Sequence, residues 1–296
     1  MCANRPDEGA LAGEAGTQPG TRAVNGLRGR LRDNVVTAHR LLLVRRARRP
    51  QRPRTRFVLY LAASLALVVL AGLVFDLPVG NYHATWPASF DKTARSVTDL
   101  GQAGWVLLAA GLALFFGSAA DWRLASLRKR MALLRVTALT GYLFTSLAAG
   151  GLIATIVKYC IGRARPLHFA ELGAFAFRPF TDATFASFPS GHATTVGGFF
   201  AAIALVFPRL RVPCLVLALW LAFTRVLVGA HYPSDVVAGL AWGAWFSYFT
   251  AMVFASRGIV FRYDANGFPV RRMGYGLALN GMRRRSNAGR RGRRLD

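Results

Sequence analysis

The feature that most constrains this chain is an apolar run of 19 residues, Phe57 to Phe75, that contains no charged side chain. A helix of that length spans the roughly 30 Å hydrocarbon core of a bilayer. Helices are favoured there because their backbone groups bond to one another and leave none unpaired in lipid. Similar runs recur along the chain, so the sequence predicts an integral membrane protein in preference to a soluble one with a buried helix.

The predicted fold class is all-α, a polytopic membrane helical bundle with six transmembrane helices and cytoplasmic N- and C-termini. The expected spans are residues 57–75, 103–120, 136–157, 191–207, 212–229 and 236–256. Charge supports this orientation, because Lys and Arg accumulate in cytoplasmic segments. Residues 1–56 carry thirteen Arg against four acidic residues, and residues 257–296 carry eleven Arg against two.

Three segments are expected: a basic, partly disordered cytoplasmic tail (1–56), a six-helix membrane domain (57–256) and a basic cytoplasmic tail (257–296). Apolar residues in 24–44 recur at helical spacing, which is typical of an amphipathic helix on an anionic membrane face or of a solvated charged helix. Residues 87–104 read as a second short amphipathic helix or a plain connection. No cleavable signal peptide is expected, so the first span should remain as an anchor.

The formal net charge of +25 could indicate nucleic-acid binding. Attraction of both tails to anionic lipids is the simpler interpretation, and no nucleic-acid partner is expected. Cys2, Cys160 and Cys214 are widely spaced and indicate neither a disulfide framework nor a zinc site.

Ionisable residues cluster at those ends of the spans that the topology places outside the cell. Lys158, Arg163 and Arg165-Pro166 follow the third span, and Pro189-Ser190-Gly191-His192 begins the fourth. Thr224-Arg225 ends the fifth span, and His231 and Asp235 precede the sixth. Ionisable groups at such positions are costly and indicate function.

These residue types suit the binding of a phosphoryl group. Lys158, Arg165 and Arg225 can surround an oxyanion, and the Arg fork matches phosphate oxygens. Ser190 is a good N-cap, and Gly191 allows close approach of an anion to the helix N-terminus. The site predicted to bind phosphate therefore contains Lys158, Arg165, Ser190, Gly191 and Arg225.

The histidines supply the chemistry. A neutral imidazole at His231 can attack phosphorus if Asp235 orients its other nitrogen. His192 can then protonate the leaving oxygen and later deprotonate water. His83 and His168 are expected to be structural, as lone histidines near helix ends usually are.

Taken together, the spacings resemble those of the type 2 phosphatidic acid phosphatase family, within the lipid phosphate phosphatase and vanadium haloperoxidase superfamily. The signature reads Lys158 to Arg165-Pro166, Pro189 to His192, and Thr224-Arg225 to His231 and Asp235, over about residues 57–256. One position departs, with Thr224 where the family usually has Ser. The resemblance implies a six-helix core, no metal or other cofactor, His231 as nucleophile and His192 as general acid.

The expected function is removal of phosphate from a lipid monoester or pyrophosphate, in the inner (cytoplasmic) membrane, with the site facing the periplasm or cell exterior. Candidate substrates are undecaprenyl pyrophosphate, phosphatidylglycerophosphate, phosphatidate and lipid A phosphates. A lipid-to-lipid phosphotransferase would carry the same signature. A vanadate-binding haloperoxidase and a non-catalytic transporter or lipid-binding scaffold are the weaker alternatives. The oligomeric state is left open.

Overall fold

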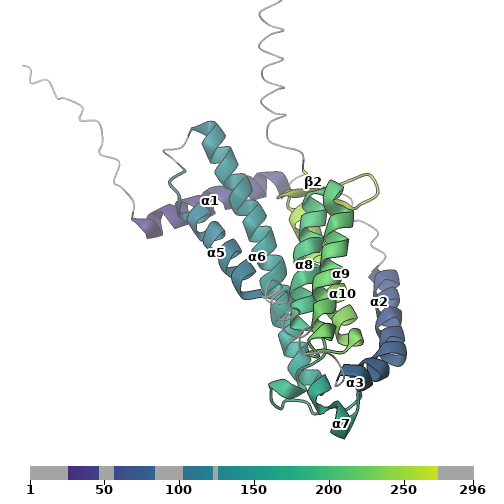
Figure 1. Cartoon of the computed structure of the whole chain (residues 1–296). Helices are drawn as coiled ribbons and strands as arrows, with labels where there is room; N and C mark the ends of the chain where they lie inside the picture. Colours follow the sequence, from purple (N-terminus) through teal and green to yellow (C-terminus); the bar gives the residue numbers. More distant parts are fainter. Residues whose placement is uncertain (1–25, 47–56, 84–102, 123–125, 273–296) are drawn as a thin grey trace, which may run out of the picture.

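A computed structural model describes residues 26–46, 57–83, 103–122 and 126–272, and this part is largely helical (Figure 1). The longer helices are α1 (Leu27–Arg46), α2 (Phe57–Ala71), α5 (Ala103–Ala119), α6 (Leu127–Ile161), α8 (Gly191–Val206), α9 (Arg211–Leu227) and α10 (Pro233–Ser256). The short helical elements are η1 (Gly72–Asp76, a π-helix), α3 (Leu77–His83), η3 (Pro166–His168), α7 (Phe169–Leu172), η4 (Ala183–Phe185) and η5 (Pro208–Leu210). Two strands, β1 (Phe261–Tyr263) and β2 (Pro269–Arg271), form an antiparallel hairpin.

Each predicted span overlaps helical residues of the structure. Four stretches of the described chain are long and apolar enough to cross a membrane: Phe57–Asn81, Arg128–Ile161, Pro208–Leu227 and Pro233–Ser256. Helices α5 and α8 are apolar but shorter, with 17 and 16 residues. The prediction of a mostly helical membrane protein is confirmed, and the count of six crossings remains a prediction.

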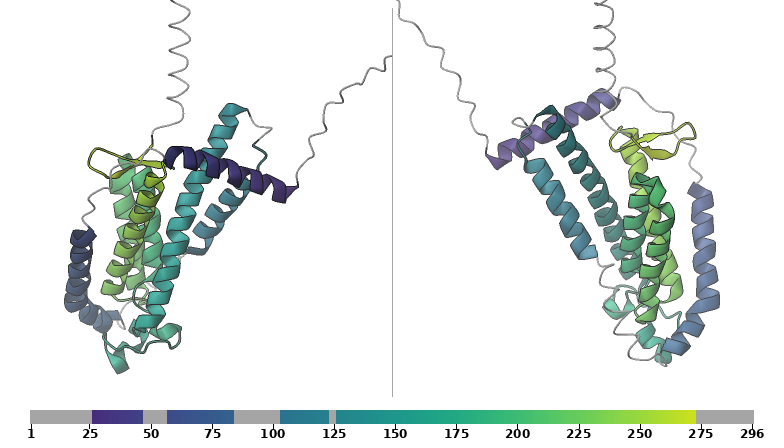
Figure 2. Two further views of the ribbon diagram at one scale, coloured as in Figure 1. Left: turned by 180° about the vertical axis from the view of Figure 1, so that it is seen from behind. Right: turned by 45° about the horizontal axis from the view of Figure 1, so that its top comes forward.

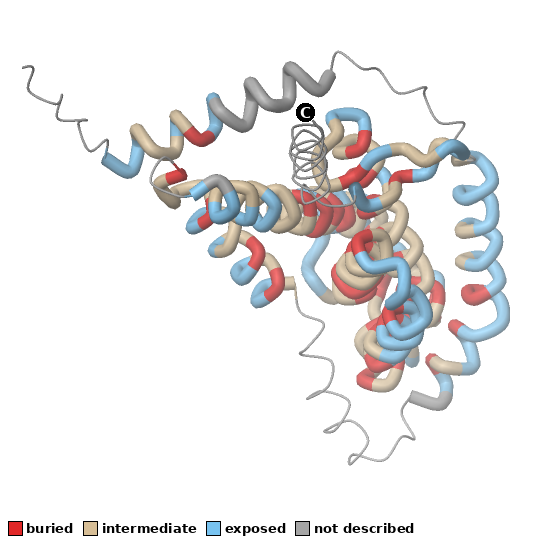
Figure 3. The backbone as a smooth tube through the Cα atoms, turned by 90° about the horizontal axis from the view of Figure 1, so that it is seen from above, coloured by how far each residue is buried: buried red, intermediate tan, exposed pale blue. Residues whose placement is uncertain are grey.

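Apolar side chains cover the outside of the bundle. Val58 on α2 is 82% exposed, and Val212 on α9 is 71% exposed. Figure 3 shows α2 exposed along most of its length. An apolar surface of this extent is stable in lipid and would be unfavourable in water.

Helix α10 lies at the centre of the bundle and contacts α8, α6, α2 and α9. Figures 1 and 2 show α5 beside α6, and α2 on the other side of the bundle. Glycines allow α8 and α10 to approach closely, as small residues commonly do in membranes. A Cβ on Gly239 would collide with Ser190 O, and one on Gly243 would collide with Thr194 O. The beginnings of α8 and α10 are thereby held together.

The first span bends where α2 gives way to η1 and α3. Pro78, in α3, has no N–H to continue the helical ladder, and prolines and π-helical turns are the usual causes of kinks. The π-helical turn ends at Asp76, whose side chain is fully buried although most of α2 is exposed. Gly72, at the start of that turn, would place a Cβ only 3.7 Å from Ser234 Cβ, so η1 lies close to α10.

The β1–β2 hairpin lies within the segment that was predicted as a C-terminal tail. Phe261 on β1 is fully buried, and its ring packs edge-on against Tyr142 with centroids 4.8 Å apart. The Tyr142 hydroxyl donates to Ser247 O over 3.1 Å, which joins α6 to α10 beneath the hairpin. This hairpin was not predicted from the sequence, and the three-segment division remains a prediction.

Helix α1 bears out the helical periodicity seen in residues 24–44. The Asn34 amide donates to Ser118 O and Ala120 O, each over 2.8 Å, and so ties α1 to the end of α5. Its contact with lipid remains a prediction. Apart from its last two residues, the amphipathic helix predicted at 87–104 lies outside the described residues.

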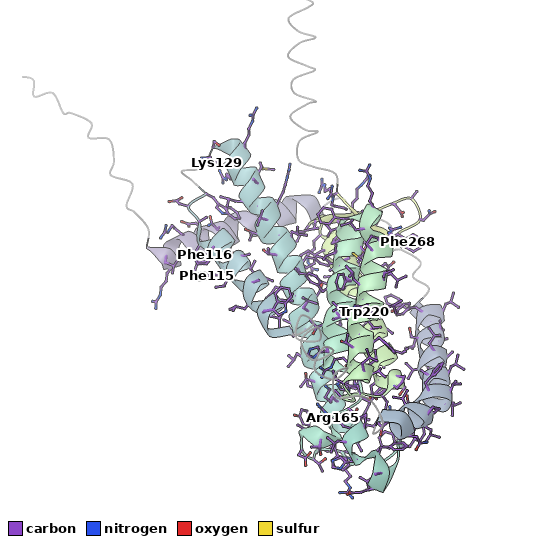
Figure 4. All side chains as sticks on the ribbon, in the orientation of Figure 1. Phe115, Phe116, Lys129, Arg165, Trp220 and Phe268 are labelled. Carbon is purple, nitrogen blue, oxygen red and sulfur yellow. The ribbon has the colours of Figure 1, made fainter. Side chains whose placement is uncertain are left out.

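The connections between helices gather at two ends of the bundle. Figure 4 shows Lys129, near the start of α6, and Arg165, beyond its end, at opposite ends of the molecule. The hairpin lies at the Lys129 end, and α3 and α7 lie at the Arg165 end (Figure 1). This arrangement agrees with the predicted alternation of spans, and the side of the membrane that each end faces remains a prediction.

Candidate active site

The first motif segment begins where α6 ends. Gly162 adopts a left-handed conformation (φ 64°), and its N–H bonds to Lys158 O over 3.0 Å. This cap is a common way for a helix to end, because glycine adopts positive φ without a steric penalty. The chain then runs extended, with Ala164 N bonded to Ala176 O and Arg165 N bonded to Thr184 O, each at 2.9 Å. Lys158 is thus fixed at the helix terminus and Arg165 just beyond it.

The second segment begins α8 and contacts both of the others. Ser190 is the N-cap, and its Oγ accepts a hydrogen bond from Ala193 N over 3.4 Å. Its own N–H donates to Asp235 O over 3.0 Å, which links it to the third segment. A Cβ placed on Gly191 would lie 3.4 Å from Lys158 Nζ, so the lysine ammonium lies against the start of α8. All three motif segments therefore meet at one end of the bundle.

His231 lies just before α10 and is 3% exposed. The pKa of His231 is lowered to about 4, mainly by burial; Asp235 opposes the shift, and the positive charges of Lys158 and Arg165 add to it. The cations predicted to hold phosphate therefore act on the predicted nucleophile. At neutral pH the His231 imidazole is uncharged, as a nucleophile must be.

Ser187 links His231 to Asp235. The distance from His231 Nδ1 to Asp235 Oδ2 is 3.7 Å, longer than a hydrogen bond. The Ser187 hydroxyl donates to the same Oδ2 over 2.6 Å, and its Oγ lies 3.4 Å from His231 Nδ1. Because that hydroxyl hydrogen is used on the carboxylate, its lone pairs are left for the imidazole. Nδ1 is then the donor, and Nε2 carries the lone pair.

Asp235 is fully buried and has partners on both carboxylate oxygens. Oδ1 accepts from Arg163 Nη1 over 2.6 Å, and Oδ2 also accepts from Tyr232 N over 3.0 Å. The second bond joins the third residue of α10 to its N-cap, as in a capping box. Arg163 in turn binds Asp76 Oδ2 over 2.7 Å.

Asp76, Ser187 and Ser234 were not predicted as members of the site, and Arg163 was noted in the first motif segment without a role. Asp76 and Arg163 could have been recognised from the sequence. Asp76 is an acidic residue directly after an uncharged apolar run, and such positions are functional by default. Arg163 lies inside the first motif segment, two residues before Arg165. Nothing in the sequence distinguished Ser187 or Ser234 from other hydroxyl residues near helix starts.

The other predicted residues lie on elements that meet at the same end of the bundle. His192 is the second residue of α8 and is half-buried. Arg225 lies in the last turn of α9, and its carbonyl accepts from Ala230 N over 3.1 Å, which shapes the turn toward His231. Arg165 Nε is buried without a hydrogen-bond partner in the described structure, which suits an anion ligand. The roles assigned to these residues remain predictions.

His168 has structural contacts at the same end of the bundle. Its Nε2 lies 2.9 Å from Thr184 Oγ1, and its ring stacks on Phe185 with centroids 5.1 Å apart. Both contacts hold the loop between α6 and α8. His83 ends α3, and its side chain lies outside the described structure.

A buried histidine with a carboxylate behind it, and with cations and a helix N-terminus close by, thus lies at one end of a bundle of helices that includes four candidate membrane spans in the described part of the chain. The chain belongs to the PAP2 superfamily. Residues 139–258 match that superfamily and include all three motif segments.

Two relatives extend the similarity over most of the chain. It is 46% identical over 219 residues to a lipid A 1-phosphatase of Rhizobium johnstonii, covering 74% of this chain and 89% of the relative. It is 45% identical over 219 residues to the lipid A 1-phosphatase of Rhizobium etli, covering 74% and 94%. A solved PAP2-type phosphatidylglycerolphosphate phosphatase of Bacillus subtilis is 18% identical, with a TM-score of 0.38 over 75% of this chain and 94% of that one.

Proposed function

We propose that this protein removes the 1-phosphate of lipid A by way of a phosphohistidine at His231. Membership of the superfamily and the two relatives make the chain a hydrolase of lipid phosphates. The finer assignment to lipid A depends on 46% sequence identity to a lipid A 1-phosphatase, in an alignment that covers 89% of that relative. The observation that carries the mechanism is the position of Ser187 between His231 and Asp235, because it leaves Nε2 as the nucleophilic nitrogen.

The reaction proceeds in two steps. His231 Nε2 forms a bond to phosphorus as the bond from phosphorus to the lipid oxygen breaks, and His192 gives that oxygen a proton. Water then attacks phosphorus, His192 takes a proton from the water, and the phosphorus–nitrogen bond breaks to release inorganic phosphate. The Nδ1–H of His231 stays directed at Ser187 and Asp235 throughout, which stabilises the charge that forms on the ring.

The remaining groups stabilise the phosphoryl oxygens. Lys158, Arg165 and Arg225 supply positive charge, and Ser190 and Gly191 present the N-terminus of α8. Such preorganised donors are the main source of catalysis in phosphoryl transfer. Because the helices of the bundle expose apolar side chains to lipid, the acyl chains of the substrate can stay in the bilayer while its phosphate enters the site. The protein lies in the inner membrane with the site on the periplasmic face, and the basic tails bind anionic lipids.

The test is a phosphate-release assay in detergent with four substrates: lipid A that carries its 1-phosphate, phosphatidate, phosphatidylglycerophosphate and undecaprenyl pyrophosphate. We expect lipid A to give the highest kcat/KM, with a mass loss at the 1-position. A tenfold preference for another lipid would overturn the lipid A assignment. Loss of lipid phosphate without release of inorganic phosphate, seen only with an acceptor lipid present, would identify a phosphotransferase.

The mechanism is tested with His231→Ala and with His168→Ala as the matched control. His168 lies at the same end of the bundle but binds Thr184 and Phe185. We expect His231→Ala to abolish phosphate release and phosphoenzyme formation, and His168→Ala to keep both. Turnover by purified His231→Ala protein would exclude His231 as nucleophile.

A further inference from the structure

Arg163 uses every donor of its guanidinium within the protein. A guanidinium carries five N–H donors. Nε and Nη2 donate to Ala174 O over 3.1 and 2.8 Å, and Nη2 also donates to Asp76 Oδ2 over 2.7 Å. Nη1 donates to Ser234 Oγ over 2.7 Å and to Asp235 Oδ1 over 2.6 Å. No N–H of Arg163 remains to bind a phosphate, although Arg163 lies two residues from Arg165.

Asp76 binds Arg163 at Nη2, whereas Asp235 binds it at Nη1. Asp76 Oδ2 accepts from Arg163 Nη2 and from Ser234 Oγ over 2.5 Å, and its Oδ1 accepts from Ser234 N over 3.0 Å. Ser234 is the second residue of α10, so its N–H is one of those that a helix leaves unpaired at its start. Asp76 thus caps the start of α10 and binds Arg163 at the same time.

All three charged groups are removed from solvent. Asp76 and Asp235 are fully buried, and the Arg163 side chain is 4% exposed. The centroid of the Tyr232 ring lies 4.5 Å from Arg163 Cζ, so the ring covers another side of the guanidinium. A buried ion pair is strongly disturbed when one partner is removed, because the other charge is left uncompensated. The position of Asp235 therefore depends on Arg163, and the position of Arg163 depends on Asp76.

The two oxygens of Asp235 have separate tasks. Oδ1 is bound to Arg163, and Oδ2 receives Ser187 and faces His231 at 3.7 Å. Because Arg163 fixes the far oxygen, it sets the plane of the carboxylate and hence the direction of Oδ2. Asp76 fixes Arg163 in turn.

The element that supplies Asp76 gives a second, independent observation. Asp76 ends the π-helical turn η1, and single π-helical turns inside helices occur frequently at functional sites. Away from this turn, α2 lies against α10 through Tyr60, whose hydroxyl donates to Ala241 O over 2.8 Å. The first span is thereby joined to the site through a carboxylate that lies outside the matched residues 139–258.

We propose that Asp76 and Arg163 are positioning residues for phosphoryl transfer: Asp76 holds Arg163, and Arg163 holds Asp235 with Oδ2 directed at Ser187 and His231. The proposal rests on the proposed function, since it extends the row of groups behind the nucleophile to the first membrane span. Neither residue touches the phosphate. Their loss should therefore slow catalysis without weakening binding of the phosphoryl group.

The test is a double-mutant cycle of Asp76→Asn with Asp235→Asn, measured by single turnover on the lipid that the wild-type protein hydrolyses best. We expect Asp76→Asn to lower the rate about 10- to 100-fold, the cost usual for groups that orient a functional side chain. In the Asp235→Asn background the same substitution should change the rate less than about twofold, because Asp76 acts through Asp235. An equal factor in both backgrounds would show a merely structural role and overturn the proposal.

Orthovanadate, a phosphate analogue, separates positioning residues from phosphate ligands. Its inhibition constant should stay within about threefold of wild type for Asp76→Asn and should rise at least tenfold for Lys158→Met. A rise with Asp76→Asn like that of Lys158→Met would place Asp76 in the anion site and contradict the proposal.

Ser234→Ala provides a second variant if Asp76→Asn does not fold, because it removes the shared hydroxyl and keeps all three charges. A loss of about three- to tenfold is expected from it, again only when Asp235 is present. Full activity of both variants beside an active wild-type protein would overturn this proposal alone. A wild-type protein that releases phosphate from no lipid would instead overturn the proposed function.

Discussion

Ser187 and Asp235 are joined by a hydrogen bond of 2.6 Å from the serine hydroxyl to Oδ2, and the same hydroxyl oxygen lies 3.4 Å from His231 Nδ1. Both residues are fully buried. The carboxylate therefore acts on the imidazole mainly through a serine. If the Asp235 carboxylate instead bound the imidazole directly, Ser187 would have no part in catalysis. Removal of the serine hydroxyl therefore distinguishes a direct contact from one through Ser187.

We predict that Ser187→Ala lowers kcat about tenfold, which corresponds to about 1.4 kcal/mol of transition-state stabilisation. KM should change less than about twofold, because the phosphate ligands are untouched. Steady-state kinetics with the preferred lipid measures both values.

Ser247→Ala is the matched control for this substitution. Ser247 is also fully buried, and its hydroxyl donates to Gly198 O over 2.8 Å, away from the site. Its removal should lower the melting temperature but not kcat. If Ser187→Ala and Ser247→Ala had the same kinetics, Ser187 would have no part in orienting His231.

The low pKa of His231 predicts how its charge depends on pH. Burial lowers the pKa from 6.5 to about 4, so the neutral form is retained as pH falls and is lost only near pH 4. An ordinary histidine would be mostly charged at pH 5.5. Histidine side-chain NMR of the wild-type protein, compared with His231→Gln, identifies the signal and its titration. A midpoint near pH 6.5 would contradict the buried, neutral nucleophile.

The helices could be predicted because apolar runs of membrane length have few other interpretations. The predicted ends of the helices were less accurate. Helix α6 extends over Leu127–Ile161, well beyond the predicted 136–157, because its first turns are charged and follow the Ser126 cap. The β1–β2 hairpin has strands of three residues, too short for an alternating pattern to be recognised.

Site residues could be predicted from the sequence only where they stand in short motif segments. Lys158, Ser190 and Asp235 were predicted because each stands in a motif whose residue types suit phosphate transfer, and their roles remain predictions. Asp76 could not be linked to them, since its contact with Arg163 depends on how α2 bends and packs against α10. Ser187 was missed for the same reason: only the folded loop brings its hydroxyl to Asp235.

Close packing of α8 on α10 predicts that Gly239→Ala impairs activity. Its Cβ would collide with Ser190 O and so push the start of α8 away from His231 and Asp235. Overpacking of this kind costs about 1–3 kcal/mol of stability, and a displacement of about 1 Å can slow catalysis about 100-fold. Thermal unfolding and kcat measure the two effects.

Gly151→Ala is the control for this prediction. A Cβ on Gly151 would meet nothing within 4 Å, so this α6 substitution should be neutral or slightly stabilising. Equal activity of Gly239→Ala and wild type would mean that the start of α8 tolerates displacement, contrary to a preorganised site.

The predicted topology places the active-site end of the bundle outside the cytoplasm, and cysteine labelling tests this in cells. Thr181 is exposed in the loop between α6 and α8, and Lys129 is exposed at the opposite end of α6 (Figure 4). In a background without Cys2, Cys160 and Cys214, a membrane-impermeant maleimide should label Thr181→Cys in intact spheroplasts. Lys129→Cys should react only after permeabilisation, because an excess of Arg and Lys keeps that end inside. The reverse pattern would place phosphate release in the cytoplasm, and labelling of both positions in intact spheroplasts would contradict a membrane crossing by α6.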